Sequence, residues 1–161
     1  GVTLVIVHDE LLRRSSPRSA VPTMLRYSTY ADSGSLYNTP PVFPIYMVGL
    51  VTKWLLVNGG LLGMANRNEN KARRLYTAID RTEFYIGTAT ADSRSLMNIT
   101  FVLPTQDLEK CFVEKAKGEG LVGLQGHRSV GGLRASIYNA YPEAGIDALV
   151  SFMAEFERTH G

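Results

Sequence analysis

The spacing of apolar residues changes along the chain, and each spacing predicts a different element. The first seven residues, GVTLVIV, are almost all apolar and rich in β-branched side chains. Such a run is typical of a strand inside a sheet that is covered on both faces. It is too short to span a bilayer and lacks the basic flank of a signal peptide. We therefore expect Gly1 to Val7 to form a buried strand, which needs neighbouring strands.

A polar stretch and then a helix follow this strand. Residues 8–38 show little periodicity, so we expect mostly loop, with a short strand near Leu25 to Tyr30. The consecutive prolines Pro40–Pro41 fix the backbone and favour a helix start just beyond them. From Val42 to Val57, apolar residues recur at three- and four-residue steps. This spacing predicts an amphipathic helix with Trp54 in the core.

The segment from Leu61 to Asp80 predicts a second helix. Leu62, Leu75 and Ile79 belong to its apolar side. The charged residues that fall largely on the other side are Arg67, Glu69, Lys71, Arg73 and Arg74. We interpret this charged run as the solvated face of the helix.

Strands and helices alternate after the second helix. The pattern predicts strands within residues 84–90 and 95–103, separated by a polar turn. Next comes a helix that Thr105 to Asp107 can cap, and that Gly118 and Gly120 close.

Two further strands and a last helix complete the pattern. Strands are expected at residues 121–127 and 132–139, on either side of a glycine-rich turn. Pro142 to His160 predicts a surface helix with one buried apolar face. Strands mixed with covering helices are typical of a small α/β or α+β layer domain, which we assign to residues 61–161. Residues 1–60 have the character of the end of a larger domain.

Composition and charge exclude several classes of protein. The 161 residues include 17 Lys and Arg and 15 Asp and Glu, a formal net charge of +2. This balance implies neither a nucleic-acid-binding field nor a basic membrane patch, so we expect no nucleic-acid or membrane partner. A single cysteine, Cys111, cannot form an internal disulfide, which fits a reducing compartment and a cytoplasmic protein. We interpret Cys111 as a small hydrophobe on a helix.

The densest polar cluster is the sequence GHRSVGGLRAS, which places His127, Arg128 and Arg134 around the pair Gly131–Gly132. Glycine adopts positive φ without a Cβ penalty, so the backbone can turn sharply and approach a ligand closely. Arginine presents paired donors to carboxylate or phosphate oxygens, and histidine can add a donor. The pattern fits a substrate with two anionic groups. It is also the pattern of surface arginines around a glycine turn.

A second candidate site lies at Asn38 and Thr39, directly before the two prolines. Small side-chain donors on a rigid turn at a helix start can bind a phosphate. The same residues can instead form an Asx turn that caps the next helix. His8 and His160 have no partner at metal-ligand spacing, so we expect both on the surface and no metal site.

Three segments together resemble phosphoserine aminotransferases. They are YNTPPVFPIYMVGLVTKWL from Tyr37 to Leu55, SLMNITFVL from Ser95 to Leu103, and GLQGHRSVGGLRASIYNAYPEAGIDALVSFMAEFERTHG from Gly123 to Gly161. In this order and spacing the similarity runs over essentially the whole chain. The resemblance implies a class V, fold-type-I, pyridoxal-phosphate-dependent homodimer of serine and possibly pyridoxine biosynthesis. Such enzymes interconvert O-phospho-L-serine and 2-oxoglutarate with 3-phosphohydroxypyruvate and L-glutamate.

The resemblance also implies a fold and a set of domains. Residues 1–60 correspond to the C-terminal end of the large cofactor-binding domain, and residues 61–161 to the small C-terminal α/β domain. The Schiff-base lysine of the family lies upstream of Gly1, so the resemblance implies no catalytic residue in this chain. We expect the chain to start at a cut in a longer polypeptide and to be inactive alone, the alternative being a non-catalytic anion-binding or dimerisation module.

The resemblance assigns roles to five residues. Asn38 and Thr39 match the pair that reaches the cofactor phosphate of the other subunit. Arg134 matches the arginine that pairs with the substrate α-carboxylate, and His127 with Arg128 match the residues that receive the substrate's phosphate or distal carboxylate. The chain departs from the family in a longer, more basic stretch from Arg13 to Thr23 and in Leu96, where an arginine is common.

Overall fold

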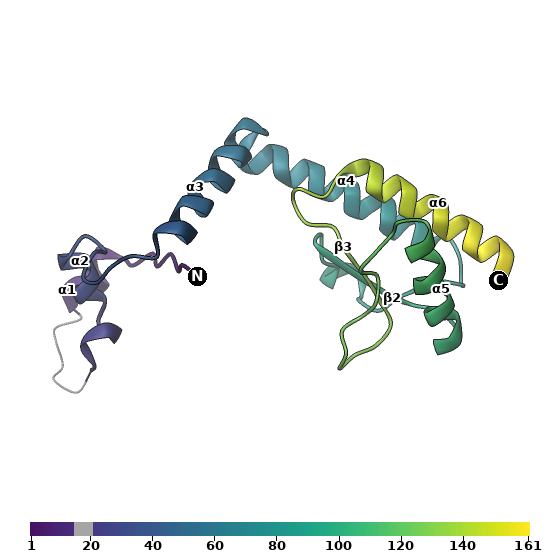
Figure 1. Ribbon diagram of the computed structural model, residues 1–161, viewed down its shortest axis with the longest axis horizontal. Coiled ribbons are helices and arrows are strands. Elements are labelled where there is room, and N and C mark those ends of the chain that lie inside the picture. The colour runs from purple at the N-terminus through teal and green to yellow at the C-terminus, as the bar shows by residue number, and fades with distance from the viewer. Residues whose placement is uncertain (15–20) are drawn as a thin grey trace. The chain divides into compact units, whose positions relative to one another are not determined.

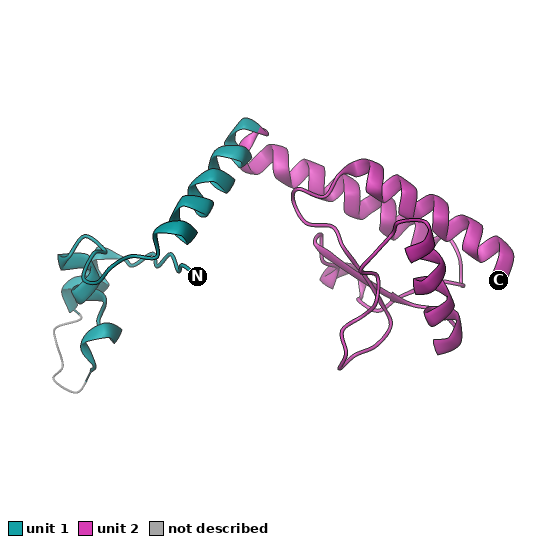
Figure 2. Cartoon of the chain, viewed as in Figure 1, with its two compact units in different colours: residues 1–57 teal, residues 58–161 magenta. Residues whose placement is uncertain are grey.

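The computed structural model describes residues 1–14 and 21–161 (Figure 1). The chain divides into two compact units, Gly1–Val57 and Asn58–Gly161 (Figure 2). Every buried hydrophobic residue that the structure describes belongs to the second unit. The hydrophobic core of the described chain is therefore the core of the second unit alone.

The expected strand from Gly1 to Val7 is not formed. Residues 1–8 have no regular secondary structure, and the side chains of Leu4 and Ile6 are 79% and 101% exposed. A strand exists only when its backbone groups pair with a neighbour. The described part of the first unit holds no strand to pair with, so this prediction of a buried strand is wrong here.

The first unit is built from short helices. Its elements are α1 (Asp9–Arg14), the 3₁₀ helix η1 (Thr23–Leu25), α2 (Tyr27–Asp32) and α3 (Val42–Val57). The predicted strand near Leu25 to Tyr30 is wrong, because local side-chain bonds favour the helical turns. The Thr29 hydroxyl donates to the Thr23 carbonyl at 2.8 Å. Residues 15–20, within the predicted loop and the longer basic stretch, lie outside the described residues.

The helix α3 has the bounds that the sequence predicted but not the amphipathic character. It contains no buried residue, and apolar side chains project from it on all sides, including Phe43, Leu50 and Val57. Trp54, which was expected in the core, is 36% exposed. A helix that is apolar all round belongs in the interior of a larger protein or in a membrane. No single described helix is long and apolar enough to span a membrane; only α3 and α4 added together reach that composition.

The second unit combines three helices with a small sheet. Its elements are α4 (Gly60–Asp80), β1 (Ile86–Gly87), η2 (Ala91–Ser93), β2 (Asn98–Val102), α5 (Gln106–Gly118), β3 (Leu133–Ser136) and α6 (Glu143–His160). The strands form an antiparallel sheet in the order β1-β2-β3. The strand expected at residues 121–127 is reduced to one bridge between Gln125 and Leu133. The mixed α/β character that the sequence predicted is confirmed.

The two faces of the sheet differ. Ile99, Phe101, Leu133 and Ala135 point to one face and are buried in the core with side chains of α4, α5 and α6. Helices α4 and α6 lie side by side over this core (Figure 1). The alternate residues of β2 and β3 are half-buried and form the open face. Because side chains alternate along a strand, this open face carries the polar residues of both strands.

The charged run on α4 is not all solvated. Lys71 is fully buried, and its Nζ donates to the carbonyls of Ile137, Tyr138 and Tyr141 at 3.0, 2.7 and 3.2 Å. Burial lowers the pKa of Lys71, and the nearby positive charge of Arg67 lowers it further. The prediction that Lys71 lies on the solvated face is therefore wrong, because three main-chain carbonyls replace water around its ammonium group.

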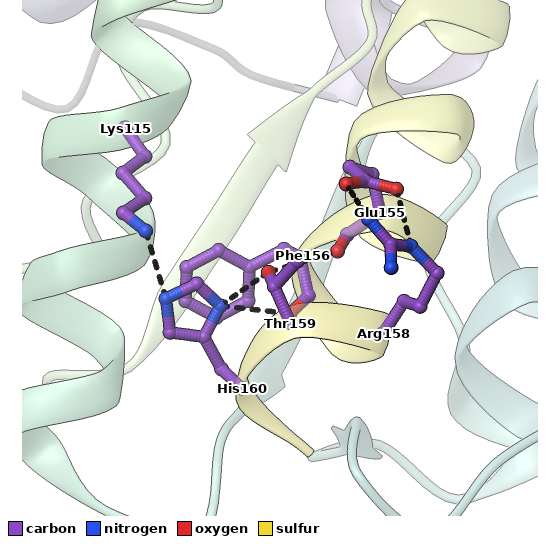
Figure 3. Close-up of polar contacts among 6 residues, drawn as sticks. All are labelled: Lys115, Glu155, Phe156, Arg158, Thr159 and His160. Carbon is purple, nitrogen blue, oxygen red and sulfur yellow. Dashed lines mark hydrogen bonds and ion pairs between the residues drawn. The ribbon is translucent and has the colours of Figure 1, made fainter.

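The C-terminal end of α6 is joined to α5 through a histidine (Figure 3). The ring of His160 stacks on Phe156 with centroids 4.2 Å apart. Its Nε2 lies 2.8 Å from the Lys115 Nζ, and its Nδ1 lies 2.9 Å from the Phe156 carbonyl oxygen. An ammonium group can only donate, so Nε2 accepts and Nδ1 carries the proton. His160 is thus half-buried in a packed contact, whereas His8 lies on the surface as expected.

Candidate functional site

The glycine-rich turn forms as the sequence predicted. Gly131 and Gly132 have φ of 80° and 68°, and the His127 carbonyl accepts from the backbone of Val130 and Gly131 at 2.9 and 2.8 Å. Gly126 closes the loop by donating to the Gly132 carbonyl at 2.8 Å. A Cβ at position 126 would collide with the carbonyl oxygens of both Gly131 and Gly132. The loop therefore depends on glycine at its entry as well as at its exit.

His127 and Arg128 lie exposed at the tip of this loop. The Nδ1 of His127 accepts from the Ser129 backbone N–H at 3.3 Å and lies 2.7 Å from its hydroxyl. Since Nδ1 acts as an acceptor, the proton of the neutral ring is on Nε2. The loop thus fixes the tautomer that can donate from Nε2 to an anion.

A cavity of about 540 Å³ separates this loop from the first turns of α5. His127 and Arg128 line it together with Gln106, Glu109 and Lys110. Arg134 does not belong to its lining. The structure therefore brings His127 and Arg128 into one cavity. Arg134 is close to them in the sequence but does not line this cavity.

Arg134 is on β3 and points to the open face of the sheet. It lies opposite Thr100 of β2, between the inward-facing residues Leu133 and Ala135. The Nε of Arg134 is buried and has no hydrogen-bond partner among the described residues. Buried polar groups are normally paired, so such a group indicates a missing acceptor. An anion at the open face can supply it.

The open face also carries residues that the sequence reasoning did not select. The Oδ1 of Asn98 accepts from the Ser136 hydroxyl at 3.0 Å and from the Tyr138 hydroxyl at 3.3 Å. The register pairs Asn98 with Ser136 and Thr100 with Arg134. The alternation of β2 and β3 could have placed these side chains on one face, but only the register shows that they are neighbours. We call Asn98, Arg134, Ser136 and Tyr138 the open-face cluster.

Asn38 and Thr39 belong to the first unit and are exposed. The Asn38 amide nitrogen donates to the Thr39 carbonyl at 3.2 Å. The backbone bond at the start of α3 runs instead from Ile45 to the Pro41 carbonyl, at 3.1 Å. Among the described residues Asn38 accepts no bond from α3, so the helix-cap interpretation has no support in the structure.

A protein-family model described as aminotransferase class-V matches residues 1–149. The chain is 56% identical over 162 aligned positions to the phosphoserine aminotransferase of Herpetosiphon aurantiacus, and 59% identical to that of Desulfosudis oleivorans. Each alignment covers 100% of this chain and 44% of the relative. The chain thus spans less than half the length of these curated relatives.

Solved structures give the same relationship. The phosphoserine aminotransferase of Bacillus circulans subsp. alkalophilus matches 96% of this chain and 43% of its own chain, with 53% identity and a TM-score of 0.89. The PLP-bound phosphoserine aminotransferase of Trichomonas vaginalis matches 85% and 39%, with 36% identity and a TM-score of 0.78. The resemblance drawn from three sequence segments is confirmed.

Proposed function

Since the chain belongs to the class-V aminotransferase family, we propose that it forms the C-terminal part of a phosphoserine aminotransferase. The complete enzyme exchanges an amino group between O-phospho-L-serine and 2-oxoglutarate, and gives 3-phosphohydroxypyruvate and L-glutamate. This reaction belongs to serine biosynthesis, and a related one to pyridoxine biosynthesis. Similarity over the whole of this chain to phosphoserine aminotransferases, of which it covers 44%, supports the proposal.

In this proposal the two parts of the chain come from different domains of a fold-type-I enzyme. Residues 1–60 are the end of the large cofactor-binding domain, and residues 61–161 are the small α/β domain. The exposed apolar surface of α3 supports this division, because such a helix needs a larger apolar environment. The complete enzyme is a homodimer in which Asn38 and Thr39 act toward the partner's cofactor.

Arg134 is the residue that binds the α-carboxylate of each substrate. The observation that carries this role is its buried and unpaired Nε on the open face of the sheet. A carboxylate accepts two parallel N–H bonds from a guanidinium group, which satisfies this nitrogen. His127 and Arg128 bind the distal phosphate or carboxylate, because the loop leaves the Nε2 of His127 and the Arg128 guanidinium exposed.

The donors on this chain fit the phosphate of pyridoxal phosphate, but they do not supply the lysine that binds the cofactor covalently. The Asn38 amide and the Thr39 hydroxyl are neutral donors suited to a phosphate oxygen, and they are the residues that would hold it. The cofactor, when bound, supplies an electron sink for the α-carbon of the substrate. The buried lysine, Lys71, is engaged by three carbonyls and is not a free amine. In this proposal the Schiff-base lysine lies upstream of Gly1, as the resemblance to phosphoserine aminotransferases implies.

A hybrid enzyme tests the proposal. The chain is joined to the remaining portion of the Herpetosiphon aurantiacus relative, and glutamate formation from 2-oxoglutarate and phosphoserine is measured. We expect the hybrid to transaminate, and Arg134→Ala to lower kcat/KM by at least about 100-fold. Arg73→Ala, which changes an exposed arginine bonded to Asn70, is the matched control and leaves the rate unchanged. A folded hybrid without activity would overturn the proposal.

Calorimetry on the 161-residue chain tests the alternative of a non-catalytic anion-binding module. Such a module binds phosphoserine tightly by itself, with heat that Arg134→Ala abolishes. A part of an enzyme has only half of the pocket, so we expect weak binding and no turnover. Micromolar binding by the chain together with an inactive hybrid would favour the module.

A further inference from the structure

The side chain of Asn98 is held in one orientation on the open face. Its Oδ1 accepts from two hydroxyl groups, those of Ser136 and Tyr138, at 3.0 and 3.3 Å. A carbonyl oxygen has two lone pairs, and the two donors use both. The amide nitrogen, which is fixed on the opposite side of the side chain, therefore points away from both hydroxyl groups and keeps its two donors for another acceptor.

Tyr138 is itself fixed by the core of the second unit. Its carbonyl accepts from the buried Nζ of Lys71 at 2.7 Å. The amide of Asn68 donates to the side chain of Asn139, the next residue, at 2.8 Å. The orientation of the Asn98 amide thus rests on a buried framework and not on exposed side chains alone.

The free amide of Asn98 and the unpaired Nε of Arg134 lie on the same face of adjacent strands. Asn98 pairs with Ser136 in the register, and Arg134 lies two residues before Ser136 on the same strand. Diagonal neighbours of this kind lie roughly 7–8 Å apart, which lets a side chain as long as arginine share one small anion with its neighbour. A carboxylate can accept from both residues, because its two oxygens offer about four lone-pair positions and a guanidinium group uses two.

We propose that Asn98 is a second binding residue for the substrate α-carboxylate, with Ser136 and Tyr138 as the positioning residues that aim its amide. The proposal rests on the proposed function, since it needs Arg134 to bind a carboxylate. The site then combines one charged and one neutral donor around a planar anion. The open-face cluster recognises the α-carboxylate that phosphoserine and glutamate share, whatever their distal groups.

Nuclear magnetic resonance of the full chain tests this role. The chain, labelled with ¹⁵N, is titrated with O-phospho-L-serine, with L-glutamate, and with O-phosphoethanolamine, which is phosphoserine without the α-carboxylate. We expect the Asn98 side-chain amide and the Arg134 Nε–H to shift together with the first two ligands and not with the third. Shifts of Arg134 without Asn98 would overturn the inference and leave the proposed function standing. The ligands are added to millimolar concentration so that weak binding by the chain is detected, and absence of shifts at both residues would overturn the inference, whereas the hybrid enzyme decides the proposed function.

Substitutions provide a second measurement. Asn98→Asp replaces the two donors by a carboxylate of the same shape, so we expect affinity for phosphoserine to fall about 10- to 100-fold. Ser136→Ala and Tyr138→Phe keep the amide but remove one aiming hydroxyl each, and should weaken binding by a few-fold. Asn70→Asp on α4 adds the same charge elsewhere and is the control. Unchanged affinity in folded Asn98→Asp and Ser136→Ala variants would overturn the role of Asn98.

Discussion

The ammonium group of Lys71 on α4 donates to the carbonyl of Tyr138, 2.7 Å away and just beyond the end of β3. This bond crosses from the helix layer to the segment that follows the open face of the sheet. It joins residues that are 67 positions apart in the sequence. The buried lysine therefore couples the stability of the second unit to the geometry of the open-face cluster.

Replacement of Lys71 should destabilise the second unit. In Lys71→Met, the carbonyls of Ile137, Tyr138 and Tyr141 lose the ammonium donor, and the Ile137 carbonyl loses it in a buried environment. We expect the free energy of unfolding to fall by about 2–4 kcal/mol. Urea denaturation measures this change. Lys110→Met, at a lysine whose side chain is 73% exposed, is the matched control and should cost less than about 1 kcal/mol.

Acid should remove a stabilising ion pair at Asp80. Arg94 donates to both of its carboxylate oxygens at 2.5 and 2.6 Å, and this lowers the pKa of Asp80 from its ordinary value of 3.8. A carboxyl group with a lowered pKa in the folded state stabilises the fold above the unfolded-state pKa, and this contribution is lost as the pH falls through the folded-state pKa. Asp80→Asn should therefore be less stable than the wild type above pH 4, with a difference that shrinks below it.

Denaturation curves between pH 2 and pH 7 measure this dependence. Asp107→Asn, at a carboxylate whose side chain is 92% exposed, serves as the control. A constant difference between wild type and Asp80→Asn over the whole range would contradict the role of the Arg94 pair.

The entry of the glycine loop should not tolerate a side chain. In Gly126→Ala, the new Cβ meets the backbone oxygens of Gly131 and Gly132, which cannot rotate away. We expect the loop to shift, with a loss of about 1–3 kcal/mol in stability and a weaker hold on the distal anion. Gly118→Ala is the control, because a Cβ there meets nothing within 4 Å and alanine favours the helix α5. A crystal structure of Gly126→Ala with an unmoved loop would refute this expectation.

The aromatic cluster around Phe156 should contribute far more than the histidine stacked on it. Phe156 is 2% exposed and contacts the rings of Phe84, Phe112 and Phe152. Phe156→Ala should cost about 3–5 kcal/mol, because it leaves a cavity in the core. His160→Ala should cost less than about 1 kcal/mol, since its bond to Lys115 is exposed to water. Thermal unfolding of both variants distinguishes the two contributions, and equal losses would contradict this ranking.

Periodicity predicted the helices of the second unit well because these helices pack against a core that the chain itself contains. It failed where the partner of a segment is not among the described residues. The apolar run GVTLVIV has the pattern of a buried strand, and it stays exposed because it has no strand to pair with. The prediction for Lys71 was wrong for a different reason. Its partners are present in the chain but distant in sequence, and a pattern of polar and apolar residues counts lysine as polar.

In the candidate site, too, the sequence predicted the features that depend on local residues and missed those that depend on distant ones. The types and spacing of His127, Arg128 and Arg134 indicated anion binding, because arginines beside a flexible glycine turn carry that chemistry locally. Asn98 and Ser136 could not be selected, because their proximity depends on the register of β2 and β3. Nor could the sequence place the two arginines relative to each other; the structure has Arg128 lining the hollow beside α5, and Arg134 on the sheet.

The confinement of the core to residues beyond Val57 has a calorimetric consequence. The heat capacity of a protein rises on unfolding by about 12–15 cal/mol/K per residue, because apolar surface becomes hydrated. A chain in which only Asn58–Gly161 carries a described core should show a heat-capacity increment of about 1.2–1.6 kcal/mol/K. A fully packed chain of the same length would show about 1.9–2.4 kcal/mol/K. Joining the chain to the remaining portion of a relative, as in the hybrid enzyme, should bring the first unit into the cooperative unfolding transition. The heat-capacity increment will then include the apolar side chains of α3.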